Sequence, residues 1–279
     1  MQLVKEDLNE KRKRILKYQI EASLALDHFL KFGIVHTVFY ATFTPLLRVQ
    51  TVHQCRDVLP AGYFAKNPGN MYGTLRSIVE KEGIRSLWRG TLINVVFFIP
   101  NFGALYFQNT NQALLAKYNV NEYFATFICH FLASNLTYPV LVTQWRRMAD
   151  VRKYTYSSYS DLFFTIFEKS GGKGYFKGLT SFALLNFIRS SVLVFAISRT
   201  DDKNTQTASV ICASLLFYPF DTIAKQLAWI SKRENLVGQA KNILKTSGLG
   251  GFYRGVSCAA IITGLPFILA QLAKENKEK

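Results

Sequence analysis

Acidic side chains are scarce in this sequence, where 18 Asp and Glu residues stand against 34 Lys and Arg and leave a net charge of +16 at pH 7. A basic chain can bind nucleic acid, but no nucleic-acid-binding motif is present and the charge follows separate connecting segments. A phosphate-binding loop is missing, and so is any grouping of nucleophile, base and orienting residue. We therefore expect neither a nucleic-acid partner nor enzyme activity.

Cysteine and histidine are few, with four residues of each. The cysteines lie far apart without metal-ligand spacing, so we expect reduced, structural residues: Cys55, Cys129, Cys212 and Cys258. The histidines share no spacing, so we assign them no site: His28, His36, His53 and His130. The sequence thus predicts no metal site and no cofactor.

Uninterrupted hydrophobic runs are absent as well, although 49% of the residues are hydrophobic. The apolar residues form six blocks, each near the ~20 residues that a helix needs to cross a bilayer. They cover residues 23–47, 91–108, 123–143, 179–198, 207–229 and 256–273. His36, His130, Arg189 and Asp221 interrupt them, which favours membrane helices with one face toward a polar interior. The remaining alternative is a large soluble protein with buried helices.

The distribution of charge predicts an orientation in the membrane. Three connecting segments are rich in Lys and Arg, at residues 48–89, 145–177 and 225–254, whereas the short connections at 109–122 and 199–206 are balanced. By the positive-inside rule, the basic segments lie on one side of the membrane and both termini on the other. Basic loops beside a bilayer also predict contact with anionic lipid.

The two ends of the chain are charged extensions. Residues 1–20 mix Lys and Arg with Glu and Asp, whereas a cleaved transit peptide is acid-poor. We expect an interfacial amphipathic helix that leads into the first span. Residues 274–279 form a short charged end that we expect to be exposed.

One unit occurs three times along the chain. Each copy opens at a proline and runs to an aromatic-basic-glycine triplet: Pro45 to Trp88-Arg89-Gly90, Pro139 to Phe176-Lys177-Gly178, and Pro219 to Tyr253-Arg254-Gly255. A repeat this long predicts a pseudo-symmetric assembly around an axis. We place the repeats at residues 21–118, 119–203 and 204–279, in one integral membrane domain.

These three copies resemble the mitochondrial carrier family, with the ADP/ATP carriers as the nearest comparison. The motifs that carry the likeness are Tyr-Pro-Phe-Asp-Thr at 218–222, Glu82-Gly83 followed by Leu-Trp-Arg-Gly at 87–90, and the run at 91–100. The resemblance covers nearly the whole chain beyond residue 20. It implies an all-α membrane protein with six transmembrane helices in three repeats and short amphipathic matrix helices. It also implies the mitochondrial inner membrane, with both termini toward the intermembrane space.

The resemblance further implies kinked odd-numbered helices and bound cardiolipin. An interior proline removes a helical hydrogen bond and clashes with the preceding turn, which explains the kinks. Cardiolipin phosphate would accept hydrogen bonds at the matrix helices and the triplets, where glycine permits close backbone approach and the basic residue supplies charge. The expected cardiolipin residues are Arg89, Gly90, Lys177, Gly178, Arg254 and Gly255.

The proline motif departs from the family pattern at the positions that close the matrix side. Active carriers read Px(D/E)xx(K/R), and the acid of one helix pairs with the base of the next. The acid and base positions here hold Leu47 and Gln50, Leu141 and Gln144, and Asp221 and Ala224. We therefore expect a degenerate matrix gate without an interhelical ion pair. Arg48 and Lys225 lie about 200° and 100° from the base positions, so we expect no replacement by either, although Lys225 could reach Asp221 by snorkelling.

The other functional positions of the family are also altered. The acid and base positions of the opposite gate hold Ile197 and Thr200 on the fourth helix. The substrate positions hold Phe97, Leu184, Leu185, Arg189 and Ile261, of which Arg189 alone is a cation. We interpret these five as vestigial substrate contacts, with a structural role for the Arg189 charge as an equal alternative.

Loss of both ionic gates predicts a carrier fold that no longer transports. We expect a structural or accessory subunit of a larger inner-membrane assembly, with a respiratory-chain complex as the host. Phe163, Phe164 and Phe167 could contact such a partner, although packing against the bundle is the simpler expectation. The alternative is an active mitochondrial solute carrier that exchanges a small metabolite by alternating access, with gates closed by hydrogen bonds from Gln50 and Gln144.

Overall fold

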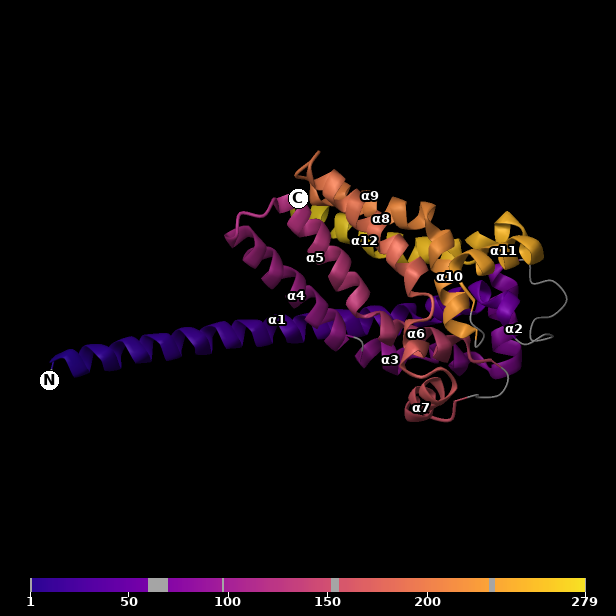
Figure 1. Cartoon of the computed structure of the whole chain (residues 1–279), viewed down its shortest axis with the longest axis horizontal. Coiled ribbons are helices and arrows are strands. Elements are labelled where there is room, and N and C mark those ends of the chain that lie inside the picture. Colours follow the sequence, from indigo (N-terminus) through magenta and orange to yellow (C-terminus); the bar gives the residue numbers. More distant parts are fainter. Residues whose placement is uncertain (1, 60–69, 97, 152–155, 231–233, 279) are drawn as a thin grey trace.

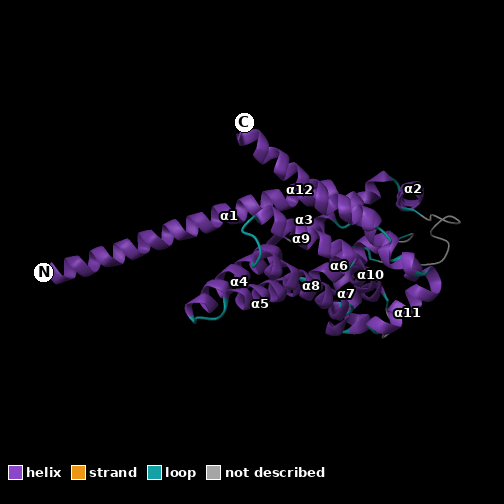
Figure 2. Ribbon diagram, turned by 90° about the horizontal axis from the view of Figure 1, so that it is seen from above, coloured by secondary structure: helices purple, strands orange, loops and turns teal. Residues whose placement is uncertain are grey.

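The computed structural model describes residues 2–59, 70–96, 98–151, 156–230 and 234–278, and within these ranges every regular element is a helix (Figure 1, Figure 2). The proline-containing segments are α1 (Gln2–Gln54), α5 (Glu122–Leu136) with α6 (Tyr138–Ala149), and α9 (Lys203–Leu216) with α10 (Tyr218–Trp229). The returning segments are α3 (Thr91–Val96) with α4 (Phe98–Lys117), α8 (Leu179–Ile197) and α12 (Val256–Glu278). The all-α fold expected from the sequence is confirmed.

A short helix and a 3-10 turn join the two segments of each repeat. The helices are α2 (Met71–Glu82), α7 (Tyr159–Ser170) and α11 (Leu236–Ser247), and the turns are η2 (Ile84–Trp88), η3 (Gly172–Phe176) and η4 (Leu249–Tyr253), with one further turn, η1 (Arg56–Val58), after α1. These elements gather at one end of the bundle, which we call the loop end (Figure 1). The α4–α5 and α8–α9 connections and both termini lie at the opposite end.

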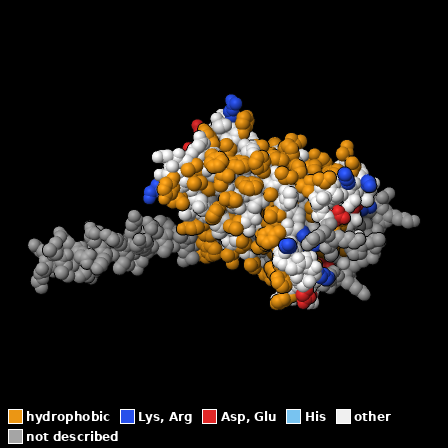
Figure 3. Space-filling model, in the orientation of Figure 1, with side chains coloured by type: hydrophobic (Ala, Val, Ile, Leu, Met, Phe, Trp, Pro, Cys, Tyr) orange, Lys and Arg blue, Asp and Glu red, His pale blue; other side chains and the backbone are white. Residues whose placement is uncertain are grey.

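Three described helical segments are long and apolar enough to cross a membrane alone: Asp27–Gln54, Gly172–Ile197 and Leu249–Leu269. The pairs α5–α6 and α9–α10 qualify together and bend by 42° and 59°, which gives up to five spans. The α3–α4 pair supplies the sixth segment of the expected fold. Figure 3 shows apolar side chains covering the face between the two ends, with charged side chains near the ends, as expected of a surface that meets lipid.

The predicted proline kinks occur as helix breaks in two repeats. Pro139 and Pro219 follow the first residue of α6 and α10, directly after the breaks. The first proline does not break its helix, because α1 runs through Pro45 as one helix of 53 residues. Proline leaves the carbonyl four residues earlier without its helical donor. Trp88 of the first triplet donates its indole N–H to that carbonyl, on Ala41, at 3.1 Å.

The N-terminal part of α1 projects beyond the rest of the bundle (Figure 2). It is helical and continuous with the first span, and its amphipathic, interfacial character stays a prediction. Cys55, Cys129 and Cys258 are buried, which agrees with the structural role expected of them. Cys212 is exposed.

Candidate functional site

The three proline-containing helices meet at the loop end, and the predicted gate positions lie on them. Leu47 packs against the cluster around α1, and Leu141 against a second cluster that includes the fully buried Ala224. Gln50 and Gln144 are also buried. Among the six gate positions, all of them in the described part of the chain, no ion pair runs between helices, as the sequence predicts.

Hydrogen bonds join α1 to α10 in place of an ion pair. Gln54, which is fully buried, donates its side-chain amide to Asp221 Oδ2 at 2.9 Å and to Thr222 Oγ1 at 3.1 Å. Its amide oxygen accepts a hydrogen bond from Lys225 Nζ at 2.8 Å, and its backbone carbonyl accepts one from Gln226 Nε2 at 2.7 Å. We call these five residues the Gln54 hub.

A further hydrogen bond, from Gln50, also joins α1 to α10. Gln50 Nε2 donates to Tyr218 Oη at 3.0 Å, and Tyr218 Oη donates to the carbonyl of Arg254 at 3.1 Å. The predicted contribution of Gln50 is therefore present. The side-chain oxygen of Gln144 is buried without a hydrogen-bond partner, so the structure shows no equivalent bond for it.

Lys225 reaches Asp221, as the length of its side chain allowed, but it does not replace the base of an interhelical pair. Lys225 Nζ lies 2.8 Å from Asp221 Oδ2, and both side chains are largely buried. The two residues are four apart, which places them one turn from each other on the same face of α10. This ion pair lies within one helix, so Gln54 is what connects it to α1. Lys225 Nζ also lies 5.7 Å from the centre of the Trp145 ring on α6.

Apolar contacts and one hydrogen bond join α6 to α10. The Tyr138, Trp145 and Phe182 rings pack against one another with centroids 5.0 to 5.8 Å apart, beside the small residue Ala228. Arg146 Nε donates to the Ala228 carbonyl at 2.7 Å. The contact between α6 and α10 therefore depends on packed aromatic rings, whereas the contact between α1 and α10 depends on side-chain amides.

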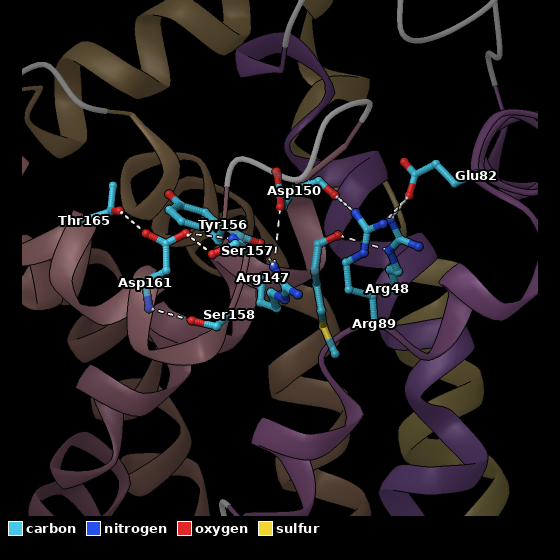
Figure 4. Close-up of polar contacts among 11 residues, drawn as sticks. Arg48, Glu82, Arg89, Arg147, Asp150, Tyr156, Ser157, Ser158, Asp161 and Thr165 are labelled. Carbon is cyan, nitrogen blue, oxygen red and sulfur yellow. Dashed lines mark hydrogen bonds and ion pairs between the residues drawn. The ribbon is translucent and has the colours of Figure 1, made fainter.

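A buried charged cluster joins α1 to α6 (Figure 4). Arg48 is fully buried, donates to the Met148 carbonyl at 3.2 Å, and lies 2.7 Å from Glu82 Oε2. Arg89 lies 3.1 Å from the same carboxylate and donates to the Asp150 carbonyl. Arg48 therefore serves this joint and not the gate position, as its angular position predicts.

Each triplet base reaches the next repeat. Arg89 donates to Asp150 after α6, Lys177 Nζ donates to the Ile230 carbonyl after α10 at 3.2 Å, and Arg254 Nη1 lies 2.6 Å from Asp57 Oδ1 after α1. Each base also contacts the residue seven positions before it: Glu82, Ser170 and Ser247 respectively. The three bases therefore form a cyclic set of contacts between repeats, which we call the clasp ring.

The triplet glycines allow neighbouring repeats to approach closely beside the clasp ring. Gly90, Gly178 and Gly255 have φ of +98°, +86° and +79°, which L side chains rarely adopt. A Cβ on Gly178 would lie 2.5 Å from the Ala224 carbonyl of the next repeat. A Cβ on Gly255 would lie 3.1 Å from Cγ of Gln50, and one on Gly90 would lie 3.0 Å from Cγ of Met148. The close approach that glycine permits is to a protein helix, and cardiolipin binding at these triplets stays a prediction.

The predicted substrate positions are not brought together by any described contact. Phe97 lies outside the described residues. Leu184 and Ile261 are each 41% exposed, whereas Leu185 is fully buried. Arg189 Nε donates to Ser214 Oγ on α9 at 2.8 Å, which is a contact between α8 and the next repeat.

Two histidines form polar contacts that the sequence analysis missed. His36 Nε2 lies 3.0 Å from Asn101 Nδ2, joining α1 to α4, and His130 Nδ1 lies 2.7 Å from Ser190 Oγ, joining α5 to α8. Both histidines lie nine residues before the proline of their repeat, so the statement that they share no spacing is wrong. Their position relative to the proline was the signal that could have identified them.

Comparison with known proteins gives the same assignment as the fold. The model of the family "Mitochondrial carrier protein" matches residues 25–114. Human "Solute carrier family 25 member 33" is 24% identical over 83% of this chain and 79% of its own length. The "Mitochondrial thiamine pyrophosphate carrier" of Macaca fascicularis is 25% identical over 69% of this chain and 73% of its own length.

A third relative, the "Probable ADP,ATP carrier protein" of Arabidopsis thaliana, is 25% identical over 80% of this chain and 78% of its own length. These relatives are named as carriers and not as enzymes. Together with the repeated proline-containing helices and triplets, the comparisons show that the chain is similar to mitochondrial carriers.

Proposed function

We propose that the protein is an active solute carrier of the mitochondrial inner membrane, with the loop end as its matrix gate. The carrier names of the relatives favour this function over the expected accessory subunit without transport. Neither the described part of the fold nor the comparisons supports a respiratory-chain role. Both termini then lie toward the intermembrane space, in agreement with the basic segments on the matrix side.

The Gln54 hub is the observation that carries this proposal. Alternating access needs contacts that close one end and that can be broken at moderate cost. Asp221 and Lys225 keep each other as partners when α1 leaves α10, because their ion pair lies within α10. Opening therefore leaves no buried charge without a partner, a situation that costs about 3–5 kcal/mol. The gate can close through hydrogen bonds and open again without an ion pair between helices.

The substrate that we propose is a small anionic metabolite. Two of the relatives are named for thiamine pyrophosphate and for ADP and ATP, which are phosphorylated anions. Arg189 is the one Lys or Arg of α8 and lies near the middle of that helix. A single cation that donates to the neutral side chains of Ser214 and Asn186 fits a substrate of low charge better than a nucleotide, because the placement of polar groups sets recognition.

Uptake by the purified protein in liposomes tests the proposal. Radiolabelled phosphate, carboxylate and nucleotide anions would be exchanged against the same internal compound. We expect counter-exchange of at least one of them, and loss of that exchange in Arg189→Gln. A protein that is folded by thermal unfolding, exchanges none of these anions and copurifies in fixed ratio with a respiratory complex would overturn the proposal.

Cardiolipin binding belongs to the same proposal. The lipid phosphate would be bound jointly by the positive charge of the triplet bases and by backbone N–H groups at helix N-termini. Native mass spectrometry of the protein from mild detergent would measure bound cardiolipin. We expect retained lipid in the wild type and less in Arg89→Ala with Arg254→Ala, and equal lipid content in both would contradict this part.

A further inference from the structure

The residue before the loop glycine differs between the three clasps of the clasp ring, which we number by repeat. In the first clasp this residue is Glu82, whose Oε2 lies 2.7 Å from Arg48 and 3.1 Å from Arg89. One carboxylate thus joins two cations. The same position holds Ser170 in the second clasp and Ser247 in the third. The first clasp therefore has an acid where the other two have a neutral hydroxyl.

The third clasp receives its acid from the repeat that it contacts. Arg254 Nη1 lies 2.6 Å from Asp57 Oδ1, and Ser247 Oγ donates to Asp57 Oδ2 at 2.8 Å. Asp57 lies twelve residues after the proline of its repeat. The equivalent residue after α10, which the second clasp contacts, is Ser231 in the sequence and lies outside the described residues. The sequence therefore places no acid at either of the two positions that supply one to the other clasps.

The cations of the first clasp bind the end of α6 (Figure 4). Arg48 Nε donates to the Met148 carbonyl at 3.2 Å, and Arg89 donates to the Asp150 carbonyl. These two carbonyls belong to the residues nine and eleven positions after the proline of the second repeat. The first clasp thus combines two carbonyl contacts with the Glu82 carboxylate, which offsets the charge of both cations.

The second clasp repeats this arrangement at the end of α10. Arg146 Nε donates to the Ala228 carbonyl at 2.7 Å, and Lys177 Nζ donates to the Ile230 carbonyl at 3.2 Å. These are again the residues nine and eleven positions after the proline of their repeat. Lys177 Nζ also donates to Ser170 Oγ at 3.2 Å. Two cations therefore meet the same two carbonyl positions, with a serine hydroxyl where the first clasp has a carboxylate.

Arg146 has donor capacity that the protein leaves unused. The residue is 4% exposed, and among the described residues its Nη2 has no hydrogen-bond partner. It forms no ion pair in the described part of the chain, and Asp150, the acid one turn further along, lies 3.7 Å from Arg147 instead. A buried cation without an anion is costly, so the site favours a negatively charged ligand. The other two groups of the clasp, Ser170 and Lys177, are partly exposed, so a small anion can reach them from the surface.

We propose that the second clasp is a phosphate-binding site formed by Arg146, Lys177 and the Ser170 hydroxyl. Serine is shorter than glutamate, so a small oxyanion occupies the position that the Glu82 carboxylate holds in the first clasp. An arginine fork and a lysine ammonium both bind phosphate strongly, and the hydroxyl adds a neutral donor. The bound phosphate offsets the two cations that hold α10 and so stabilises the contact between the second and third repeats. It belongs to inorganic phosphate or to a lipid headgroup, and its binding does not require transport.

Thermal unfolding of the purified protein tests the site, with inorganic phosphate as the probe and the ionic strength held constant with sodium chloride. For the free ion, we expect the unfolding temperature of the wild type to rise by about 2–4 °C at a phosphate concentration tenfold above the Kd. Ser170→Glu supplies the carboxylate within the chain, so it should raise the unfolding temperature without phosphate and abolish the response to phosphate. Ser247→Glu is the matched control. It places a carboxylate beside Asp57, so it should lower the unfolding temperature and keep the phosphate response.

Native mass spectrometry of the protein from mild detergent separates the two sources of the phosphate group. A phospholipid that the wild type retains and Ser170→Glu loses identifies a lipid headgroup. A phosphate-dependent unfolding temperature without such a lipid identifies the free ion. Arg146→Gln is a second variant that should lose the same ligand, because it removes the charge and keeps a polar side chain.

The contrary results are distinct. A wild type that does not respond to phosphate and carries no phospholipid that Ser170→Glu loses overturns the proposal. A phosphate response that persists in full in both Ser170→Glu and Arg146→Gln also overturns it, because the anion then binds elsewhere, as at Arg189. Unfolding and bound mass are measured without uptake, so a failure of this site is separate from a failure of transport.

Discussion

Replacement of Gln54 by methionine tests whether the Gln54 hub closes the loop end. Methionine keeps the length and most of the volume of glutamine but cannot form the three side-chain hydrogen bonds to Asp221, Thr222 and Lys225. Bonds to charged groups contribute about 1.5–3 kcal/mol each and neutral ones about 1. The three bonds sum to about 4–7 kcal/mol, but Asp221 and Lys225 retain each other, so we expect a smaller cost of about 2–4 kcal/mol for the closed arrangement. That corresponds to roughly 30-fold to 1,000-fold in the equilibrium between closed and open states.

Cys55 provides a native reporter for the opening. It follows Gln54 directly and is 1% exposed, so a maleimide reaches it only when the joint opens. We expect Gln54→Met to raise the labelling rate of Cys55 strongly and to lower the thermal unfolding temperature. Gln206→Met is the control, because Gln206 lies at the opposite end and makes one neutral bond, to the Thr200 carbonyl at 2.8 Å. Unchanged labelling and unfolding in Gln54→Met would refute the role of the hub.

Three further predictions concern the joints and α7. Gly178→Ala should destabilise the protein by about 1–3 kcal/mol more than Gly83→Ala in thermal unfolding, because both glycines have positive φ but only Gly178 faces a close backbone carbonyl. Equal effects would contradict the close approach. Trp88→Phe should cost about 1 kcal/mol through loss of the indole hydrogen bond, and no change in unfolding would show that water replaces it. Hydrogen bonds from the Ser157 backbone N–H and hydroxyl hold the pKa of Asp161 below its usual range, so this contact at the start of α7 is stabilising at neutral pH and is lost as the pH falls through that lowered pKa. Hydrogen exchange of α7 amides should rise on acidification below about pH 4, and Asp161→Asn should remove that pH dependence.

The repeated unit was predictable because its signals are local. The prolines and triplets recur in register, and each marks a backbone requirement that a sequence displays directly. The lack of interhelical ion pairs at the gate positions could be predicted for the same reason, since it follows from the residue types at six places. The topology needed only the order of apolar and basic segments.

What replaces the ion pairs could not be predicted from those six positions. Gln54 lies four residues beyond Gln50, and its importance depends on which residues of α10 it meets across the bundle. The length of the lysine side chain allowed the bond between Lys225 and Asp221, but the gate positions gave no indication that Gln54 would connect this pair to α1. The triplet bases similarly act on another repeat, and distance along the chain gives no indication of that contact.

The clasp ring also constrains how many repeats the fold can contain. Arg89 holds the second repeat, Lys177 the third and Arg254 the first, so the series of contacts returns to its starting point. A fragment of two repeats would leave one basic side chain without its acceptor and one helix end without its donor. A closed series has no first member, so the same order of units could begin at a different repeat. In such a circular permutant all three joints would persist.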